Sequence, residues 1–373
     1  MCQFEDGEEI EIPNINQYGN SLISGESTLM LPKQKIENDN LSSSFISEFK
    51  DSLMKNANTK IENKNTGTRT LVAIRVDALD SSTTMTKKQI RKRLFGKSSK
   101  IISLKSQYSK CSFKQLKFKP FHGKTLTNAV IKKGVGEVSI PMNTTNATKA
   151  AVVNAIEEAV AQKYGKLKNQ VNHFMYILPP GTGDWLATGV VNGKKSVCND
   201  LLGCDNLSVL MHEIGHNLNL YHSGEGNRDY VKVGEGNTFY ADESCYMGFG
   251  SYNLDLMEEG IDIQKCFNGA KSWHLNWYNK GQILVNPDSP FFEGNLIGVV
   301  YFDQLQSDKV IVKIEGSELD YYVAFNHRAK FNSMSIEGQD LVLVTSRKSG
   351  NKPALSKLEA KLDEGDSYNV EGN

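Results

Sequence analysis

Short runs of apolar residues predict strands in the middle of the chain. Residues 68–76 form a β-branched run, which is typical of a buried strand. Residues 115–121 alternate apolar and basic side chains, as a half-exposed strand does, and we expect residues 136–141 to be the neighbouring strand. Residues 171–178 form a further apolar run, which a Pro-Pro-Gly sequence ends. These runs are the predicted strands of this region.

Patterns with helical spacing separate the predicted strands. We expect helices at about residues 86–95 and 103–110. Residues 147–164 carry apolar side chains at helical spacing, and either Asn146 or Thr148 is available as the N-cap. Strands that alternate with helices favour an α/β fold.

Residues 187–197 form an extended stretch that glycines interrupt. Its position, just before the helical pattern of residues 207–218, suits an edge strand that a peptide substrate could extend by main-chain hydrogen bonds. An ordinary sheet edge explains the same pattern.

Residues 207–218 predict a helix with histidines opposite its apolar face. His212 and His216 are one turn apart, so both rings can reach one metal ion at ~2.0–2.1 Å, the usual zinc–nitrogen distance. Glu213 lies beside them and is not expected to be a ligand. The apolar side of the helix is formed by Leu207, Leu210, Met211, Ile214 and Leu218.

A third histidine follows the predicted helix end. Asn219 marks that end, because helices often stop at a residue in the left-handed conformation, which asparagine tolerates. The chain can then reverse and bring His222 to the metal, so we interpret residues 211–222 as a zinc site. The alternative is a solvated helix face, which would be expected to carry lysine and glutamate instead.

The two ends of the chain have different compositions. Residues 1–68 are rich in Asn, Ser, Lys and Glu, which predicts a largely disordered linker or the remnant of a propeptide. Cys2 could cap a metal ion in a latent form, or be an unpaired thiol on a mobile end. Beyond about residue 284, four strand-like runs predict a small β-rich domain at residues 285–373. These runs are 299–302, 310–314, 321–325 and 341–345.

Charge and composition exclude some classes of partner. Lys+Arg and Asp+Glu are both 43, a balance that indicates neither nucleic acid nor an anionic membrane surface as partner. No apolar run is long enough to span a membrane. No secretory signal is visible, whereas the six cysteines and four glycosylation sequons favour an extracellular protein. The sequons begin at Asn40, Asn143, Asn146 and Asn206.

Further motifs resemble one peptidase family. Met247, within residues 244–250, resembles the Met-turn that lies beneath the zinc of metzincin peptidases. Together with residues 266–278, the Leu-Lys-Ser-Gln-Tyr sequence at 104–108 and the Leu-Pro-Pro-Gly sequence at 178–181, it resembles the gametolysin-like family, peptidase family M11. The resemblance covers about residues 69–373.

The resemblance implies a metzincin-like catalytic domain, an α/β (α+β) zincin with a twisted, mostly parallel sheet, at residues 69–284. It implies zinc as the cofactor, with His212, His216 and His222 as ligands, and it implies Met247 as the Met-turn residue.

The resemblance also assigns Glu213 as the general base, which takes a proton from water and passes it to the leaving amine. This sequence departs from the metzincin pattern at two places. Asn219 replaces the usual glycine, and Phe249 stands where some metzincins carry a zinc-binding tyrosine, so a tyrosine ligand is not expected.

The cysteines suggest two crosslinks, although pairing does not follow from sequence. Cys198 and Cys204 flank the approach to the zinc helix, and a Cys245–Cys266 disulfide would join the Met-turn to the following helix. Free buried cysteines are the alternative.

The resemblance implies a zinc-dependent endopeptidase that hydrolyses extracellular-matrix or cell-wall proteins, located outside the cell or in its wall, and this is the predicted function. One alternative is a matrix-binding or adhesion protein with weak catalysis on the same scaffold. Another is a metal-dependent hydrolase of small amides.

Overall fold

The computed structural model describes residues 65–96, 102–183, 185–225, 238–248, 262–286, 288–350 and 354–370, and four short strands nearer the N-terminus. The chain divides into two compact units, Met1–Lys64 and Asn65–Asn373. In the first unit, two antiparallel pairs are formed by β1 (Cys2–Gln3) with β2 (Glu9–Ile10) and β3 (Ile36–Glu37) with β4 (Asn40–Leu41). Residues 65–68 of the predicted linker are described and already include the start of a long strand, whereas the remaining residues of the linker and the side chain of Cys2 lie outside the described residues.

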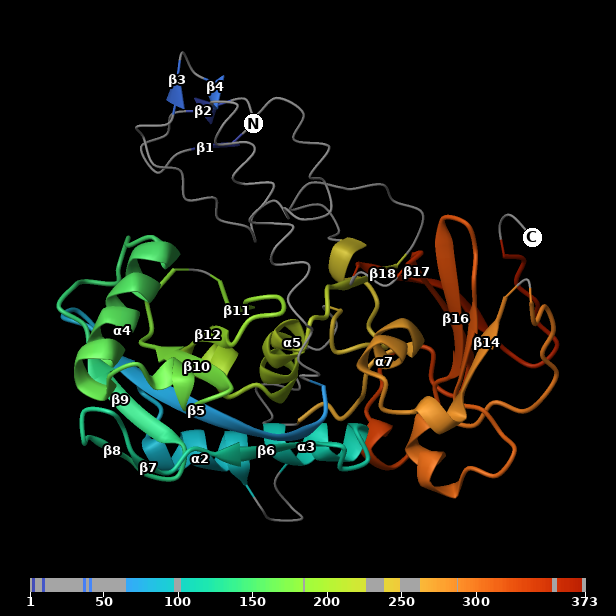
Figure 1. Cartoon of the computed structure of the whole chain (residues 1–373), viewed down its shortest axis with the longest axis horizontal. Helices are drawn as coiled ribbons and strands as arrows, with labels where there is room; N and C mark the ends of the chain where they lie inside the picture. The colour runs from blue at the N-terminus through green and yellow to red at the C-terminus, as the bar shows by residue number, and fades with distance from the viewer. Residues whose placement is uncertain are drawn as a thin grey trace. The chain divides into compact units, whose positions relative to one another are not determined.

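A mostly parallel sheet dominates the first half of the second unit (Figure 1). Its order is β11-β12-β10-β5-β6, with β9 also paired to β5, and only β11 runs antiparallel to its neighbour. This confirms the predicted twisted, mostly parallel sheet and puts β11 at an edge. The strands are β5 (Gly67–Asp77), β6 (Leu116–Pro120), β9 (Val135–Ser139), β10 (His173–Leu178), β11 (Ala187–Gly189) and β12 (Lys195–Asn199).

The long strand β5 pairs with two partners on one side. Its first half, from Gly67 to Leu71, pairs with β6, and its second half, from Ala73 to Asp77, pairs with β9. The expectation that residues 136–141 are the neighbour of residues 115–121 is therefore wrong. An eleven-residue strand is long enough to pair with two five-residue strands in series, and strand patterns alone do not show that. A small hairpin, β7 (Gly123–Lys124) with β8 (Val130–Ile131), lies between these strands in the chain.

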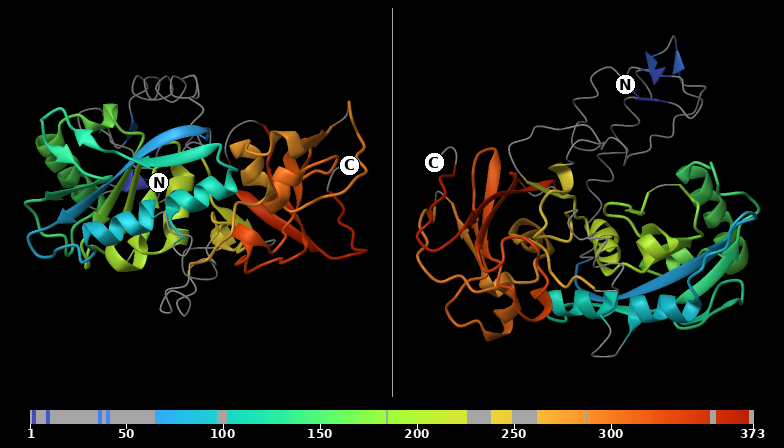
Figure 2. Two further views of the ribbon diagram at one scale, coloured as in Figure 1. Left: turned by 90° about the horizontal axis from the view of Figure 1, so that it is seen from below. Right: turned by 180° about the vertical axis from the view of Figure 1, so that it is seen from behind.

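Alternation along the central strands divides the core of this part in two. In β5, Leu71 and Ala73 face one cluster, while Val72, Ile74 and Val76 face the other, because successive side chains of a strand point to opposite faces. One face is covered by α4 and the other by α2, α3 and α5 (Figures 1 and 2). Helices thus cover both faces of the sheet, as an α/β fold requires.

The helices begin where the sequence supplies caps. Thr86 and Ser103 each form a capping box at α2 and α3, and of the two candidate caps for α4 it is Thr148 that accepts a hydrogen bond from Ala151 N. The three predicted helices are confirmed. The α-helices are α2 (Lys87–Phe95), α3 (Leu104–Cys111), α4 (Lys149–Tyr164), α5 (Leu207–Asn217) and α7 (Gly269–Leu275). In the described part of the chain, none of them is long and apolar enough to cross a membrane.

A second, mainly antiparallel sheet follows α5, in the order β13-β18-β17-β16-β15-β14. The predicted strands at 310–314, 321–325 and 341–345 are confirmed, and α7 packs on β16 and β17. The strands are β13 (Ser223–Glu225), β14 (Gln282–Val285), β15 (Ile311–Ile314), β16 (Leu319–Phe325), β17 (Val342–Lys348) and β18 (Ser356–Leu362).

The predicted strand at 299–302 is wrong, because these residues belong to a 3-10 helix, Val299–Gln304. The ring of Phe302 packs against Phe113 and Tyr278, at centroid distances of 5.3 and 5.2 Å. A compact turn brings this apolar group to one aromatic cluster, so its β-branched composition does not require a strand. The remaining short helices are Leu167–Asn169, Asp200–Cys204 (π-helical), Thr238–Tyr240, Asn279–Gly281 and Lys330–Asn332.

The second sheet takes strands from both sides of residue 284. Its outer strand β13 directly follows His222, and β13 pairs in parallel with β18, more than 130 residues later in the chain. Residues 285–373 were predicted as a separate domain, yet they lie in the same compact unit as the rest of the chain from Asn65. This half of the unit is β-rich, as expected, but it shares its sheet with the segment that carries His222.

Candidate metal centre

The helix α5 carries two of the three candidate ligands and is buried along its whole length. Its N-cap is Asn206, whose side-chain oxygen accepts hydrogen bonds from Ser208 N and Val209 N. From α3, the Tyr108 hydroxyl donates to the Met211 carbonyl at 2.7 Å. Because the Asn206 side chain is 9% exposed and engaged in the cap, the sequon that starts there is a poor glycosylation site in the folded chain.

The helix ends where the sequence predicts. Asn219 has φ +72°, the left-handed conformation expected there, and its N–H donates to the His216 carbonyl at 2.8 Å. Leu220 N donates to the Gly215 carbonyl at 3.1 Å. The chain therefore reverses within a few residues and brings His222 back beside α5.

The three histidines converge. Candidate ligand atoms of His212, His216 and His222 all lie within 4.8 Å of one another. The Nε2 atoms of His216 and His222 are 3.1 Å apart. Two nitrogens on one tetrahedral zinc ion would be roughly 3.3 Å apart, given the usual zinc–nitrogen distance.

Backbone carbonyls orient two of the rings. His212 Nδ1 lies 2.8 Å from the Tyr246 carbonyl, and His216 Nδ1 lies 2.8 Å from the Leu220 carbonyl. A carbonyl only accepts hydrogen bonds, so each Nδ1 carries the proton and each Nε2 presents its lone pair to the centre. This is the tautomer that a metal-ligating histidine needs.

Burial keeps the imidazoles neutral. It lowers the pKa of all three histidines, that of His216 to about 4, and the mutual proximity of the rings lowers the pKa of His212 and His222 further. Buried, neutral and convergent nitrogens match the donor set that zinc takes in catalytic sites. The residues present therefore fit a zinc ion.

Glu213 lies on α5 beside the edge strand β11. A Cβ atom added to Gly189 of β11 would be 2.4 Å from the Glu213 carbonyl and 3.0 Å from its Oε2. Asn217, further along α5, donates from its side chain to the carbonyls of Val190 and Lys195, which holds the β11–β12 hairpin against the helix. The predicted edge strand and the predicted general base thus lie side by side.

Met247 lies against the middle of α5. A Cβ added to Gly215 would be 2.6 Å from the Met247 sulfur, and Met247 is fully buried. Its carbonyl accepts a hydrogen bond from Ser223 N at 2.9 Å. The turn therefore contacts both the helix of the first two histidines and the residue that follows the third.

An aromatic residue that sequence reasoning missed lies against the histidines. The ring centroid of Tyr240 is 4.0 Å from that of His222 and 6.0 Å from that of His212. Phe249, on which the expectation of no tyrosine ligand rested, lies outside the described residues. Tyr240 ends the short helix Thr238–Tyr240 and has no recognisable spacing from the histidines, so the sequence carries no signal for its position.

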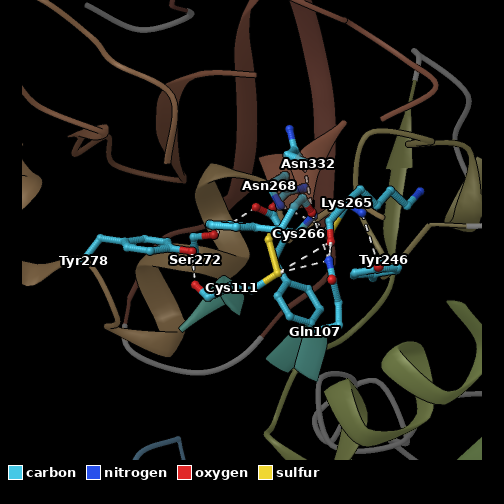
Figure 3. Close-up of a disulfide and its surroundings, with 12 residues drawn as sticks. Gln107, Cys111, Tyr246, Lys265, Cys266, Asn268, Ser272, Tyr278 and Asn332 are labelled. Carbon is cyan, nitrogen blue, oxygen red and sulfur yellow. Dashed lines mark hydrogen bonds between the residues drawn. A yellow bond between two sulfur atoms is a disulfide. The ribbon is translucent and has the colours of Figure 1, made fainter. Parts of the chain in front are cut away.

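One of the two expected crosslinks differs. Cys198 bonds Cys204, but Cys266 bonds Cys111 of α3, so the expected Cys245–Cys266 disulfide is wrong (Figure 3). Cys245 is a buried free thiol whose sulfur accepts hydrogen bonds from Met247 N and Asn268 N. Residues 111 and 266 are far apart in sequence, and only the packing of α3 on the segment before α7 brings them together.

Hydrogen bonds surround the Cys111–Cys266 disulfide. Gln107 of α3 donates to the carbonyls of Lys265 and Phe331, and Asn332 accepts from Cys266 N (Figure 3). The disulfide therefore joins α3, which covers the first sheet, to the segment that leads into the second sheet.

The sequence matches the family model described as Gametolysin peptidase M11 over residues 69–273, more than half of its 373 residues. No curated protein matches it. Among solved structures, wild-type OgpA from Akkermansia muciniphila is similar, with a TM-score of 0.36 and 12% identity over 78% of this chain and 92% of that chain. A mutant of promirolysin from Tannerella forsythia is similar with a TM-score of 0.34 and 11% identity, over 70% and 92% of the two chains.

Proposed function

The chain belongs to the gametolysin family of metallopeptidases, peptidase M11, and on that premise we propose that it is a zinc-dependent endopeptidase. The observation that carries the proposal is the convergence of three buried, neutral histidines, His212, His216 and His222, beside Glu213. We propose these histidines as the zinc ligands and Glu213 as the general base.

Each proposed residue has a distinct task. When bound, zinc would supply Lewis acidity, which lowers the pKa of water and polarises a peptide carbonyl. Glu213, 4% exposed and one residue from His212, would accept the proton of the attacking water and deliver it to the leaving amine. The neutral histidines would leave the positive charge of the ion undiminished, which favours a negatively charged transition state.

The substrate proposal follows from the edge strand. Among the residues that the structure describes, strand β11 pairs only with β12, and it runs past Glu213 at Gly189. An extended peptide that paired with this edge would bring its backbone past the general base. We therefore propose protein substrates, with extracellular-matrix or cell-wall proteins as the class and the outside of the cell or its wall as the location.

A matrix-binding or adhesion protein is the competing function, and a hydrolase of small amides is another. Glu213 counts against the first, because adhesion needs no general base. The edge strand counts against the second, because a small amide has no backbone to pair with it.

The test is hydrolysis of casein or gelatin by the purified chain, with and without a chelator. Activity should be lost on chelation, return with zinc, and fall about 10²–10⁴-fold in Glu213→Ala, the range for loss of a general base. Glu157→Ala is the matched control, since Glu157 lies on α4 in an ion pair with Lys195, and it should keep full activity. Activity that survives both chelation and Glu213→Ala would overturn the proposal, and hydrolysis of dipeptide amides without hydrolysis of proteins would favour the small-amide alternative.

A further inference from the structure

We infer that four buried polar side chains, Ser223, Asp242, Asn268 and Ser356, act as positioning residues for His222. We call this group the Asp242 cluster. The inference rests on the proposed function in that it takes His222 as a metal ligand, and it adds the residues that hold this ligand in place.

His222 differs from the other two histidines in how its backbone is held. His212 and His216 lie within α5, whose own hydrogen bonds position them. His222 lies between the helix end at Asn219 and the strand β13, so no helix positions it. Its position depends on what holds the chain on either side.

On the C-terminal side, the second sheet and the Met-turn hold the chain. The His222 carbonyl accepts a hydrogen bond from Ser356 N at 3.2 Å, and Ser223 N donates to the Met247 carbonyl at 2.9 Å. Ser223 and Ser356 are also partners in the parallel pairing of β13 with β18. The last strand of the chain is therefore bonded to a candidate metal ligand.

Side chains reinforce this junction. Ser223 Oγ donates to Asp242 Oδ2 at 2.6 Å and lies 2.7 Å from Ser356 Oγ. Asn268 Nδ2 lies within hydrogen-bonding distance of all three neighbours, at 2.8 Å from Ser223 Oγ, 2.7 Å from Asp242 Oδ2 and 3.3 Å from Ser356 Oγ. Asp242 Oδ1 accepts from the backbone and side chain of Ser244.

The cluster is sealed from water and shares one acceptor. Ser223, Asp242 and Ser356 are fully buried and Asn268 is 6% exposed. A buried carboxylate is tolerated only where donors surround it, and here Asp242 receives two hydrogen bonds on each oxygen. Its donors come from β13, from the Met-turn segment and from the N-cap of α7, so Asp242 joins these three segments at one point.

Asp242 also anchors the aromatic neighbour of His222. Its N–H donates to the Ser223 carbonyl at 3.3 Å, and Tyr240, two residues earlier, packs its ring on the His222 ring. The backbone and the ring of the third ligand are thus held from the same segment.

The experiment compares Asp242→Asn with the wild-type chain in cobalt(II) and zinc titrations. The substitution keeps the shape but turns one acceptor oxygen into a donor that faces other donors. Loss of a residue that holds a metal ligand in place commonly weakens metal affinity about 10–100-fold. We expect an affinity decrease of that size here, together with a changed visible absorption spectrum of the cobalt form. The spectrum reports the geometry of the ligands around the metal. A substitution that only lowers stability would leave this geometry unchanged in the molecules that remain folded.

Two further variants separate positioning from stability. Asp320→Asn is the matched control, because Asp320 is a buried carboxylate of β16 in an ion pair with Lys313 at 2.9 Å. It should lower the unfolding midpoint and leave the cobalt spectrum and affinity unchanged. The double variant D242N/N268D restores a carboxylate–amide pair in the exchanged order and should recover part of the affinity, since aspartate also serves as the N-cap of α7.

The outcomes are distinct. If wild type binds neither metal, the proposed function fails. If wild type binds metal and Asp242→Asn keeps both the affinity and the spectrum, the positioning role is overturned while the proposed function stands. If Asp242→Asn does not fold, Ser356→Ala takes its place, and an unchanged cobalt spectrum there would overturn the role equally.

Discussion

The two sheets of the second unit contribute to the metal centre in different ways. The first sheet and α5 are built from one stretch of chain, from β5 to Asn217, and they carry His212, Glu213 and His216 at fixed helical spacing. The second sheet joins β13, next to His222, to strands that follow much later in the chain. Two ligands are therefore positioned by local structure, and the third by contacts between distant segments.

This difference determines where the site is vulnerable. A helix holds its side chains at i and i+4 through its own hydrogen bonds, so His212 and His216 stay paired as long as α5 exists. His222 depends on a tight turn on one side and on packing between the sheets on the other. Changes at the junction of the two sheets should consequently affect His222 before they affect α5.

The largest expected effect comes from breaking the covalent link between the two regions. The Cys111–Cys266 disulfide closes a sequence separation of 155 residues, whereas Cys198–Cys204 closes a separation of 6. In the chain-entropy model, closing these loops stabilises the folded chain by about 5 and about 2 kcal/mol, respectively. We expect C111S/C266S to destabilise the chain more than C198S/C204S does, as measured by urea unfolding. Equal losses would show that the long-range link contributes no more than a local one.

The next effect concerns the contact between α5 and the Met-turn. Gly215→Ala would put a methyl group 2.6 Å from the Met247 sulfur. Overpacking of this kind typically costs about 1–3 kcal/mol, and here it should also shift the turn that bonds Ser223. The double variant G215A/M247A makes room for the methyl group, so it should lose less stability than the two single variants lose together. Strict additivity in urea unfolding would contradict a direct contact.

A smaller effect is expected at the helix end. Asn219→Val forces a β-branched residue into φ +72°, at a cost of about 1–2 kcal/mol, and should weaken zinc binding because His222 follows three residues later. Asn219→Gly should retain zinc binding. Asn276→Val is the control, since Asn276 ends α7 at φ +57°, and it should lose comparable stability without loss of zinc. Zinc binding unaffected by Asn219→Val would contradict the role of this turn.

Sequence reasoning succeeded where the signal is local and failed where it is not. Helical spacing predicted the position of His212 and His216, and the tolerance of asparagine for positive φ predicted the reversal at Asn219. The partner of Cys266 and the pairing of β18 with β13 could not be predicted, because each joins segments more than 130 residues apart. Tyr240 was missed for a different reason, since it follows His222 by only 18 residues but no sequence pattern shows that its ring packs on the His222 ring.

The smallest predicted effect is a pH dependence of stability on the second-sheet side. Lys271 of α7 is 2% exposed, and burial lowers its pKa to about 7, an effect that Arg347 reinforces and that Cys245 and Asp242 oppose. Lys265, fully buried, has its pKa lowered to about 8, mainly by burial. Both amines release a proton in the folded chain at a pH where the unfolded chain keeps it, so their contribution to stability should rise from pH 7 upwards.

Two matched variants assign this rise to its source. Between pH 7 and 8, Lys271 should contribute more of the increase than Lys265, because its pKa is lowered to about 7 and that of Lys265 only to about 8. Lys271→Met should therefore flatten the dependence more than Lys265→Met does, as measured by urea unfolding at each pH. Loss of the hydrogen bond from Lys271 Nζ to the Ala354 carbonyl changes stability at every pH and leaves the slope alone. An unchanged slope in Lys271→Met would mean that this lysine stays protonated at the junction of the sheets, with Asp242 and Cys245 outweighing its burial.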